Sequence, residues 1–73
     1  MLSETDHDIK LRFGKRLKTV RAELGYSQEG LALASGLDRS YIGGVERGER
    51  NISLVNIQKL AKTLNVSPKE FFE

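Results

Sequence analysis

Apolar residues along most of this chain recur at spacings of three and four, with polar residues between them. This is the period of one face of an α-helix. The first such face comprises Ile9, Phe13, Leu17, Val20 and Leu24. The pattern predicts a first helix over residues 9–24, with Gly25 as its C-terminal stop.

Two short helices are predicted next, and they lie close together in the sequence. Ser27 is a good N-cap for a helix over 28–35, which Gly36 would end. Asp38 is a second N-cap candidate and opens a helix over 39–47. Because only three residues separate them, these two helices are predicted to form a helix-turn-helix.

A fourth helix and a final turn complete the pattern. Ser53 caps the fourth helix, and its predicted inner face comprises Leu54, Ile57, Leu60, Ala61 and Leu64. Ser67 caps the last turn, with Pro68 at the first helical position and Glu70 completing a capping box. Since no strand signal occurs, the chain is predicted to be all-α, a compact five-helix bundle whose helix-turn-helix covers residues 28–47.

The length of the chain limits its organisation. A chain of 73 residues buries one modest core, so we expect a single domain over residues 1–73, with no separate catalytic lobe. Residues 1–7 are expected to form a flexible tail. With 38% hydrophobic and 30% charged residues, the composition is that of an ordinary globular domain.

The sequence also bears on where the protein acts. It contains no apolar run near the roughly 20 residues that a membrane-spanning helix requires, and its acidic, polar N-terminus is unlike a secretory signal. The absence of cysteine excludes disulfides and thiolate metal sites. We therefore expect a cytoplasmic protein with no membrane partner.

Charge is distributed unevenly along the chain. The formal net charge is only +2, but three of the ten acidic residues, Glu4, Asp6 and Asp8, lie in the first eight positions. The remainder of the chain carries twelve basic and seven acidic residues. A body this basic favours a polyanionic partner, although a solvated basic surface accounts equally well for charge alone.

The predicted third helix has two distinct faces. Successive rotations of 100° place Tyr41, Ile42 and Val45 inward. The outward arc contains Arg39, Ser40, Gly43, Gly44 and Arg47. Such a face is narrow enough to enter the major groove of DNA, where arginine bonds guanine and serine bonds base edges. Each of the two glycines destabilises the helix by about 1 kcal/mol relative to alanine. Two explanations are open: the bare backbone lets the helix approach DNA closely, or the tertiary packing tolerates the glycines.

The segment from Gln28 to Gly48 resembles the helix-turn-helix of the Xre family, which includes the phage repressors and Cro. In that family an alanine packs the two helices together, a glycine begins the turn and apolar residues recur at set positions. The matching residues here are Ala32, Gly36, Leu31, Leu37, Ile42 and Val45. The resemblance implies a lambda-repressor-like fold that binds double-stranded DNA.

The stretches 37–42 and 45–53 are similar, more closely, to the controller proteins of restriction-modification systems. That resemblance implies a homodimer on a palindromic operator, with Arg39 and Ser40 contacting bases and Gly43 and Gly44 lying on the same base-contacting face. It places on the DNA backbone Gln28, Tyr41, Arg47, Asn51 and the cap residue Ser27.

Two structural pairings accompany the resemblance. It sets Arg21 of the first helix opposite Glu46, as a partly buried ion pair. The homodimer interface is expected to comprise Val55, Ile52, Gln58, Phe71 and Phe72. Phe71 and Phe72 are adjacent, so they cannot both face one core.

Other classes of function are less well supported. The single histidine, His7, lies in the expected tail, and the sequence offers no catalytic pair, metal cluster, cofactor site or small-molecule site. A phage-type or chromosomal repressor remains an alternative, as does an antitoxin-like interaction module. If the protein activates transcription, RNA polymerase is a further partner, and Glu29 on the second helix is a candidate contact.

Overall fold

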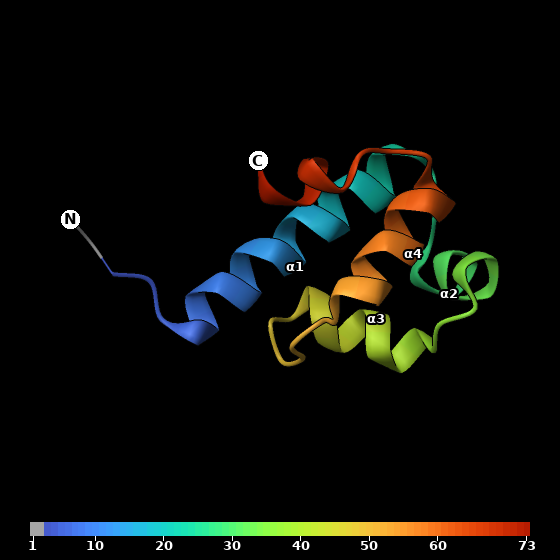
Figure 1. The fold of residues 1–73 in the computed structure, drawn as a ribbon. Coiled ribbons are helices and arrows are strands. Elements are labelled where there is room, and N and C mark those ends of the chain that lie inside the picture. The colour runs from blue at the N-terminus through green and yellow to red at the C-terminus, as the bar shows by residue number, and fades with distance from the viewer. Residues whose placement is uncertain (1–2) are drawn as a thin grey trace.

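The computed structural model describes residues 3–73, which form four α-helices and one 3₁₀ helix (Figure 1). In chain order these elements are α1 (Asp6–Glu23), α2 (Gln28–Ser35), α3 (Arg39–Glu46), α4 (Leu54–Leu64) and the 3₁₀ helix η1 (Pro68–Phe72). The prediction of five α-helices is therefore wrong for the last element. Its backbone closes an i→i+3 hydrogen bond from Glu70 N to Ser67 O, as short terminal turns often do.

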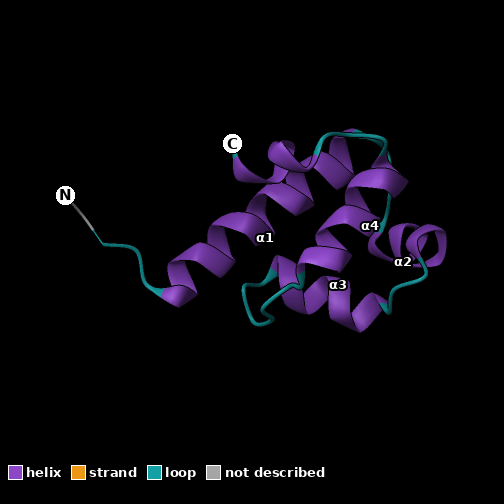
Figure 2. Cartoon of the chain, viewed as in Figure 1, coloured by secondary structure: helices purple, strands orange, loops and turns teal. Residues whose placement is uncertain are grey.

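The helices are joined by short loops, and the described residues contain no strand (Figure 2). Within the same residues, no helix combines the length and apolar content needed to cross a bilayer. The observed α2 has the predicted bounds, whereas α3 ends at Glu46, with Arg47 as its C-cap.

The first helix begins earlier than its apolar pattern predicted. Thr5 is the N-cap, and its hydroxyl accepts a hydrogen bond from Asp8 N while Thr5 N donates to the Asp8 carboxylate. These reciprocal bonds form a capping box and lower the pKa of Asp8. Asp6 and His7, expected in a flexible tail, thus form the first turn of α1; residues 1–2 of that tail lie outside the described residues.

A single core fills the space between the helices. Its buried apolar members are Phe13, Leu17, Val20, Leu31, Ala32, Ile42, Val45, Leu60, Ala61, Leu64 and Phe71. Ile42 and Val45 of α3 are buried as the helical face predicted. Leu54 is an exception, because it was expected on the inner face of α4 but is 82% exposed at the first turn.

Helices α1 and α3 approach each other closely at Gly14. A methyl group added at Gly14 would overlap the backbone carbonyl oxygen of Val45 and lie 2.6 Å from that of Glu46. Backbone atoms cannot rotate away as a flexible side chain can. Gly14 therefore sets the distance between α1 and α3, and nothing in the helical pattern of the sequence marked it.

We expect Gly14→Ala to lower the free energy of unfolding by about 1–3 kcal/mol, because the added methyl overpacks the contact between the helices. The change would otherwise favour helix α1 by about 1 kcal/mol. Urea unfolding followed by circular dichroism measures the effect, with Lys15→Ala on the exposed side of α1 as the control. A stabilised Gly14→Ala variant would contradict the close approach.

Candidate nucleic-acid interface

The α2 and α3 helices are held as a helix-turn-helix by their caps and by the turn between them. The Ser27 hydroxyl accepts a hydrogen bond from Gly30 N (2.9 Å) and starts α2. Gly36 ends α2 with φ of 77°, a left-handed conformation that favours glycine. The Ser35 hydroxyl accepts from Leu37 N across the turn. The turn thereby presents the start of α3 at the surface.

A hydrogen-bonded network joins α1, α2 and α3 beneath this surface. The Arg21 guanidinium donates from Nε to Glu46 Oε2 (2.6 Å) and from Nη2 to Glu46 Oε1 (3.0 Å). Its Nη1 donates to the Tyr26 carbonyl oxygen (2.8 Å). The predicted partners are thus brought together, with the Glu46 side chain only 3% exposed. The bond to Glu46 raises the pKa of Arg21.

The same network fixes Gln28, which the resemblance to controller proteins placed on the DNA backbone. Its Nε2 donates to Glu46 Oε1 (2.9 Å). Because a carboxylate only accepts, this bond determines which way the amide faces. One Nε2 hydrogen and Oε1 remain for another partner, so Gln28 is a positioned side chain at the first residue of α2.

The outward arc of α3 differs from its prediction at the two glycines. Both are buried, although bare backbone was expected there. A methyl group at Gly43 would lie 3.0 Å from Arg47 Nη1 and 3.6 Å from Gln28 Oε1. A methyl group at Gly44 would lie 2.8 Å from Arg50 Cγ. Atoms of Gln28, Arg47 and Arg50 therefore occupy the space over the glycines, where a side chain of α3 would otherwise lie.

Arg50 is a member of this face that the sequence reasoning missed. Its guanidinium carbon lies 5.8 Å from the centre of the Tyr41 ring, within the range of a cation–π contact. The Tyr41 hydroxyl in turn accepts a hydrogen bond from Asn56 Nδ2 of α4 (3.1 Å). The signal available in the sequence was a second arginine just beyond Gly48, in the loop that follows α3.

The remaining predicted DNA contacts are exposed at the two ends of α3. Arg39 and Ser40 lie at its start, where Arg39 Nε is 3.7 Å from Glu29 Oε1 of α2. Arg47 follows its end and pairs through Nε with Glu49 (3.1 Å). Asn51 is exposed in the loop before α4. These side chains are free to meet a ligand without unfolding any element.

The expected dimer residues do not all lie on the surface. Val55 is 65% exposed and Phe72 is 57% exposed, and Gln58 is exposed as well. Ile52 is partly buried against the core. Phe71 is completely buried, so its assignment to an interface is wrong: η1 turns one ring into the core and leaves its neighbour at the surface.

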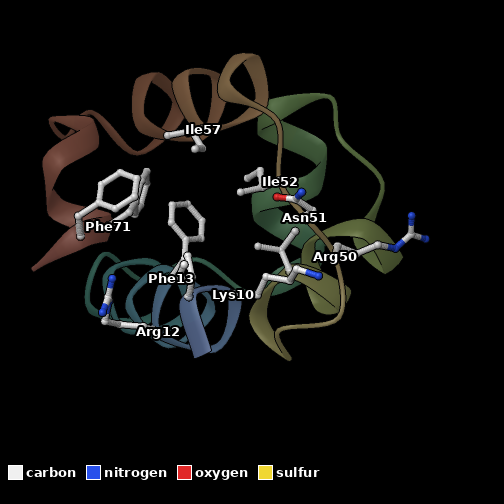
Figure 3. A pocket seen from close by; sticks show the side chains of 11 residues that line it. Lys10, Arg12, Phe13, Arg50, Asn51, Ile52, Ile57 and Phe71 are labelled. Carbon is white, nitrogen blue, oxygen red and sulfur yellow. The ribbon is translucent and has the colours of Figure 1, made fainter. Parts of the chain in front are cut away.

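A hollow of about 230 Å³ lies beside these residues, between α1, α4, η1 and the loop before α4 (Figure 3). Phe13 and Ile57 point into it, whereas Arg50 extends away from it. The centre of the Phe13 ring lies 5.4 Å from the ring centres of both Phe71 and Phe72. The described residues include no group of three or more histidine, cysteine or carboxylate side chains placed to hold a metal ion.

Comparison with known proteins finds relatives over nearly the whole chain. A family model described as Helix-turn-helix matches residues 17–71. The control protein C.MunI from Mycoplasma sp is 45% identical over 67 residues, which cover 90% of this chain and 90% of the relative.

Two solved structures are also similar. The restriction-modification controller protein C.AhdI from Aeromonas hydrophila superposes with a TM-score of 0.85 at 59% identity, covering 88% of this chain and 97% of that protein. The controller protein C.Esp1396I, solved as a tetramer in complex with its natural 35 base-pair operator, gives a TM-score of 0.79 at 39% identity, covering 88% and 84%.

Glu46→Gln should lower the free energy of unfolding by about 3 kcal/mol, because the partly buried guanidinium of Arg21 loses its counter-charge. Chemical denaturation measures this loss. The control is Glu49→Gln, which breaks an exposed ion pair with Arg47 and is expected to cost under about 1 kcal/mol. Equal effects of the two substitutions would show that the Arg21 pair contributes no more than a surface contact.

Proposed function

Because the chain belongs to the helix-turn-helix family, we propose that it is a sequence-specific DNA-binding regulator of transcription, and specifically a restriction-modification controller protein. It binds a palindromic operator as a homodimer. The observation that carries this proposal is the exposed start of α3, where Arg39 and Ser40 project from a helix that is anchored to α1 and α2. The 45% identity to a control protein and the 59% identity to a solved controller protein support the controller role.

The start of α3 enters the major groove in this proposal. Arg39 donates two hydrogen bonds to O6 and N7 of a guanine, and Ser40 bonds a neighbouring base edge. Gly43 and Gly44 leave space over α3 that Gln28, Arg47 and Arg50 occupy, so these side chains form the part of the face above the glycines. The C.Esp1396I structure, which contains operator DNA, supports double-stranded DNA as the partner.

Phosphate contacts fix the register of the protein on the duplex. We assign them to Gln28, Tyr41, Arg47, Asn51 and Ser27. Gln28 is supported by its fixed amide, which keeps one Nε2 hydrogen for a phosphate oxygen while the other is bonded to Glu46. Arg47 would exchange its exposed partner Glu49 for a phosphate.

A second copy of the chain is the other partner. A single recognition helix contacts only a few base pairs, which is too few to distinguish an operator from competing sites. Two such helices about one duplex turn apart contact both halves of a palindrome. The exposed apolar side chains of Val55 and Phe72, with Leu54 next to Val55 in the sequence, support an interface on α4 and η1.

Two alternative functions and one further partner are compatible with the same fold. A phage-type or chromosomal repressor would use the same face, and an antitoxin-like module would use the fold without contacting bases. If the protein activates transcription, RNA polymerase is a partner and Glu29, with a side chain 81% exposed, is a candidate contact. The proposed partner is DNA, so the expected site of action remains the cytoplasm, and the proposed role is not enzymatic.

Arg39→Ala tests the central contact. Sequences selected from a random duplex pool by the wild-type protein are expected to share a two-fold-symmetric site with one guanine position in each half. The variant should lose the preference at that position, worth about 1–3 kcal/mol, while other positions are retained. If the wild-type protein enriches no sequence, sequence-specific binding is wrong; if Arg39→Ala keeps the guanine preference, the assignment of Arg39 is wrong.

Val55→Glu tests the dimer. A buried unpaired carboxylate in the interface should convert the protein to a monomer at micromolar concentration, as measured by sedimentation equilibrium, and weaken operator binding. Leu33→Glu is the matched control, since Leu33 is 88% exposed on α2, outside the proposed interface, and its substitution should leave the dimer intact. A wild-type monomer would show that the dimer proposal is wrong, and a dimer that survives Val55→Glu would place the interface elsewhere.

A further inference from the structure

We propose that Glu29 is a specificity-determining residue that acts through Arg39: it holds the guanidinium for guanine and opposes its contact with phosphate. This inference rests on the proposed function, in which Arg39 contacts a base. Glu29 lies in the first turn of α2, and Arg39 is the first residue of α3. Their closest charged atoms, Glu29 Oε1 and Arg39 Nε, are 3.7 Å apart.

The pairing resolves an electrostatic problem at the start of α3. A cation in the first turn of a helix opposes the helix dipole, and α3 has no acidic residue in its first turn. The N-cap residue Asp38 makes no side-chain cap bond there. Besides the Asp38 carboxylate at the N-cap, Glu29 supplies an anion within ion-pair distance of Arg39 from the neighbouring helix, where its own charge is favoured by the N-terminus of α2. Both side chains line a shallow depression between α2 and α3.

The shape of the guanidinium group determines which of its nitrogen atoms Glu29 leaves available for a base. A guanidinium has one Nε edge and two Nη groups in a single plane. Glu29 approaches the Nε edge, so both Nη groups stay available for the O6 and N7 atoms of guanine. The Arg39 side chain is 60% exposed and has no other charged group within ion-pair distance in the described residues. Without Glu29 it would have to give up more rotamer freedom when it binds the base.

The negative charge of Glu29 also favours contact of Arg39 with a base over contact with a phosphate. Its side chain is 81% exposed beside the proposed DNA face, where it repels phosphate groups. An Arg39 released from Glu29 would neutralise a phosphate as readily as it contacts a base. Non-specific binding would then increase, and the ratio of specific to non-specific affinity would fall.

Glu29→Gln tests the proposal on labelled duplexes that carry the selected operator, the same operator with the guanine opposite Arg39 replaced, and an unrelated sequence. We expect discrimination for guanine to fall about three- to tenfold. Binding to the unrelated duplex should strengthen, and its dependence on salt should steepen by up to one phosphate equivalent. Glu23→Gln, which removes the same charge from the exposed end of α1, is expected to leave discrimination unchanged.

The double variant Glu29→Gln with Arg39→Ala shows whether Glu29 acts through Arg39. In the Arg39→Ala background, Glu29→Gln should cause no further loss of discrimination. Circular dichroism should show the wild-type protein, the two single variants and the double variant equally folded. If Arg39→Ala abolishes the guanine preference but Glu29→Gln leaves discrimination intact, the role of Glu29 is overturned and the proposed function stands. If Arg39→Ala itself has no effect, the base contact is wrong and this inference is overturned with it.

Discussion

The contact between α1 and α3 at Gly14 is the constraint on which the rest of the structure depends. A side chain larger than hydrogen there would meet the carbonyl oxygens of Val45 and Glu46, so the two helices lie as close as their backbones allow. This proximity brings Arg21 of α1 within bidentate reach of Glu46 at the end of α3. Packing and electrostatics thus fix one helix against the other at two points of the same interface.

The buried ion pair connects this packing to the surface. Glu46 satisfies Arg21 on one side and accepts the Gln28 amide on the other, so a stabilising group also orients a side chain at the start of α2. A buried carboxylate is costly unless its hydrogen bonds are satisfied, and every buried polar side-chain atom in the described residues has a partner. The face that we propose for DNA is therefore set by the core beneath it.

The surface of α3 is organised before any ligand binds. The side chains of Gln28, Arg47 and Arg50 lie over Gly43 and Gly44, and Arg50 also lies against the ring of Tyr41. Side chains placed in this way lose less conformational freedom when they meet a phosphate or a base. The cost of two glycines within a helix is offset by the close packing that they allow.

The helices and the helix-turn-helix followed from the sequence alone, because a period of 3.6 and the cap residues Ser27, Gly36 and Ser53 are local signals. The tertiary structure decided which residues each element buries. Phe71 is in the core, whereas Leu54 is 82% exposed at the first turn of α4, because packing against other elements and not the helical period alone selects the buried residues. The Gln28 amide over Gly43 and the close approach at Gly14 depend on segments distant in sequence, so no local pattern contained them. Arg50 is only six residues from Gly44, but its contact depends on how the loop after α3 folds back on the helix.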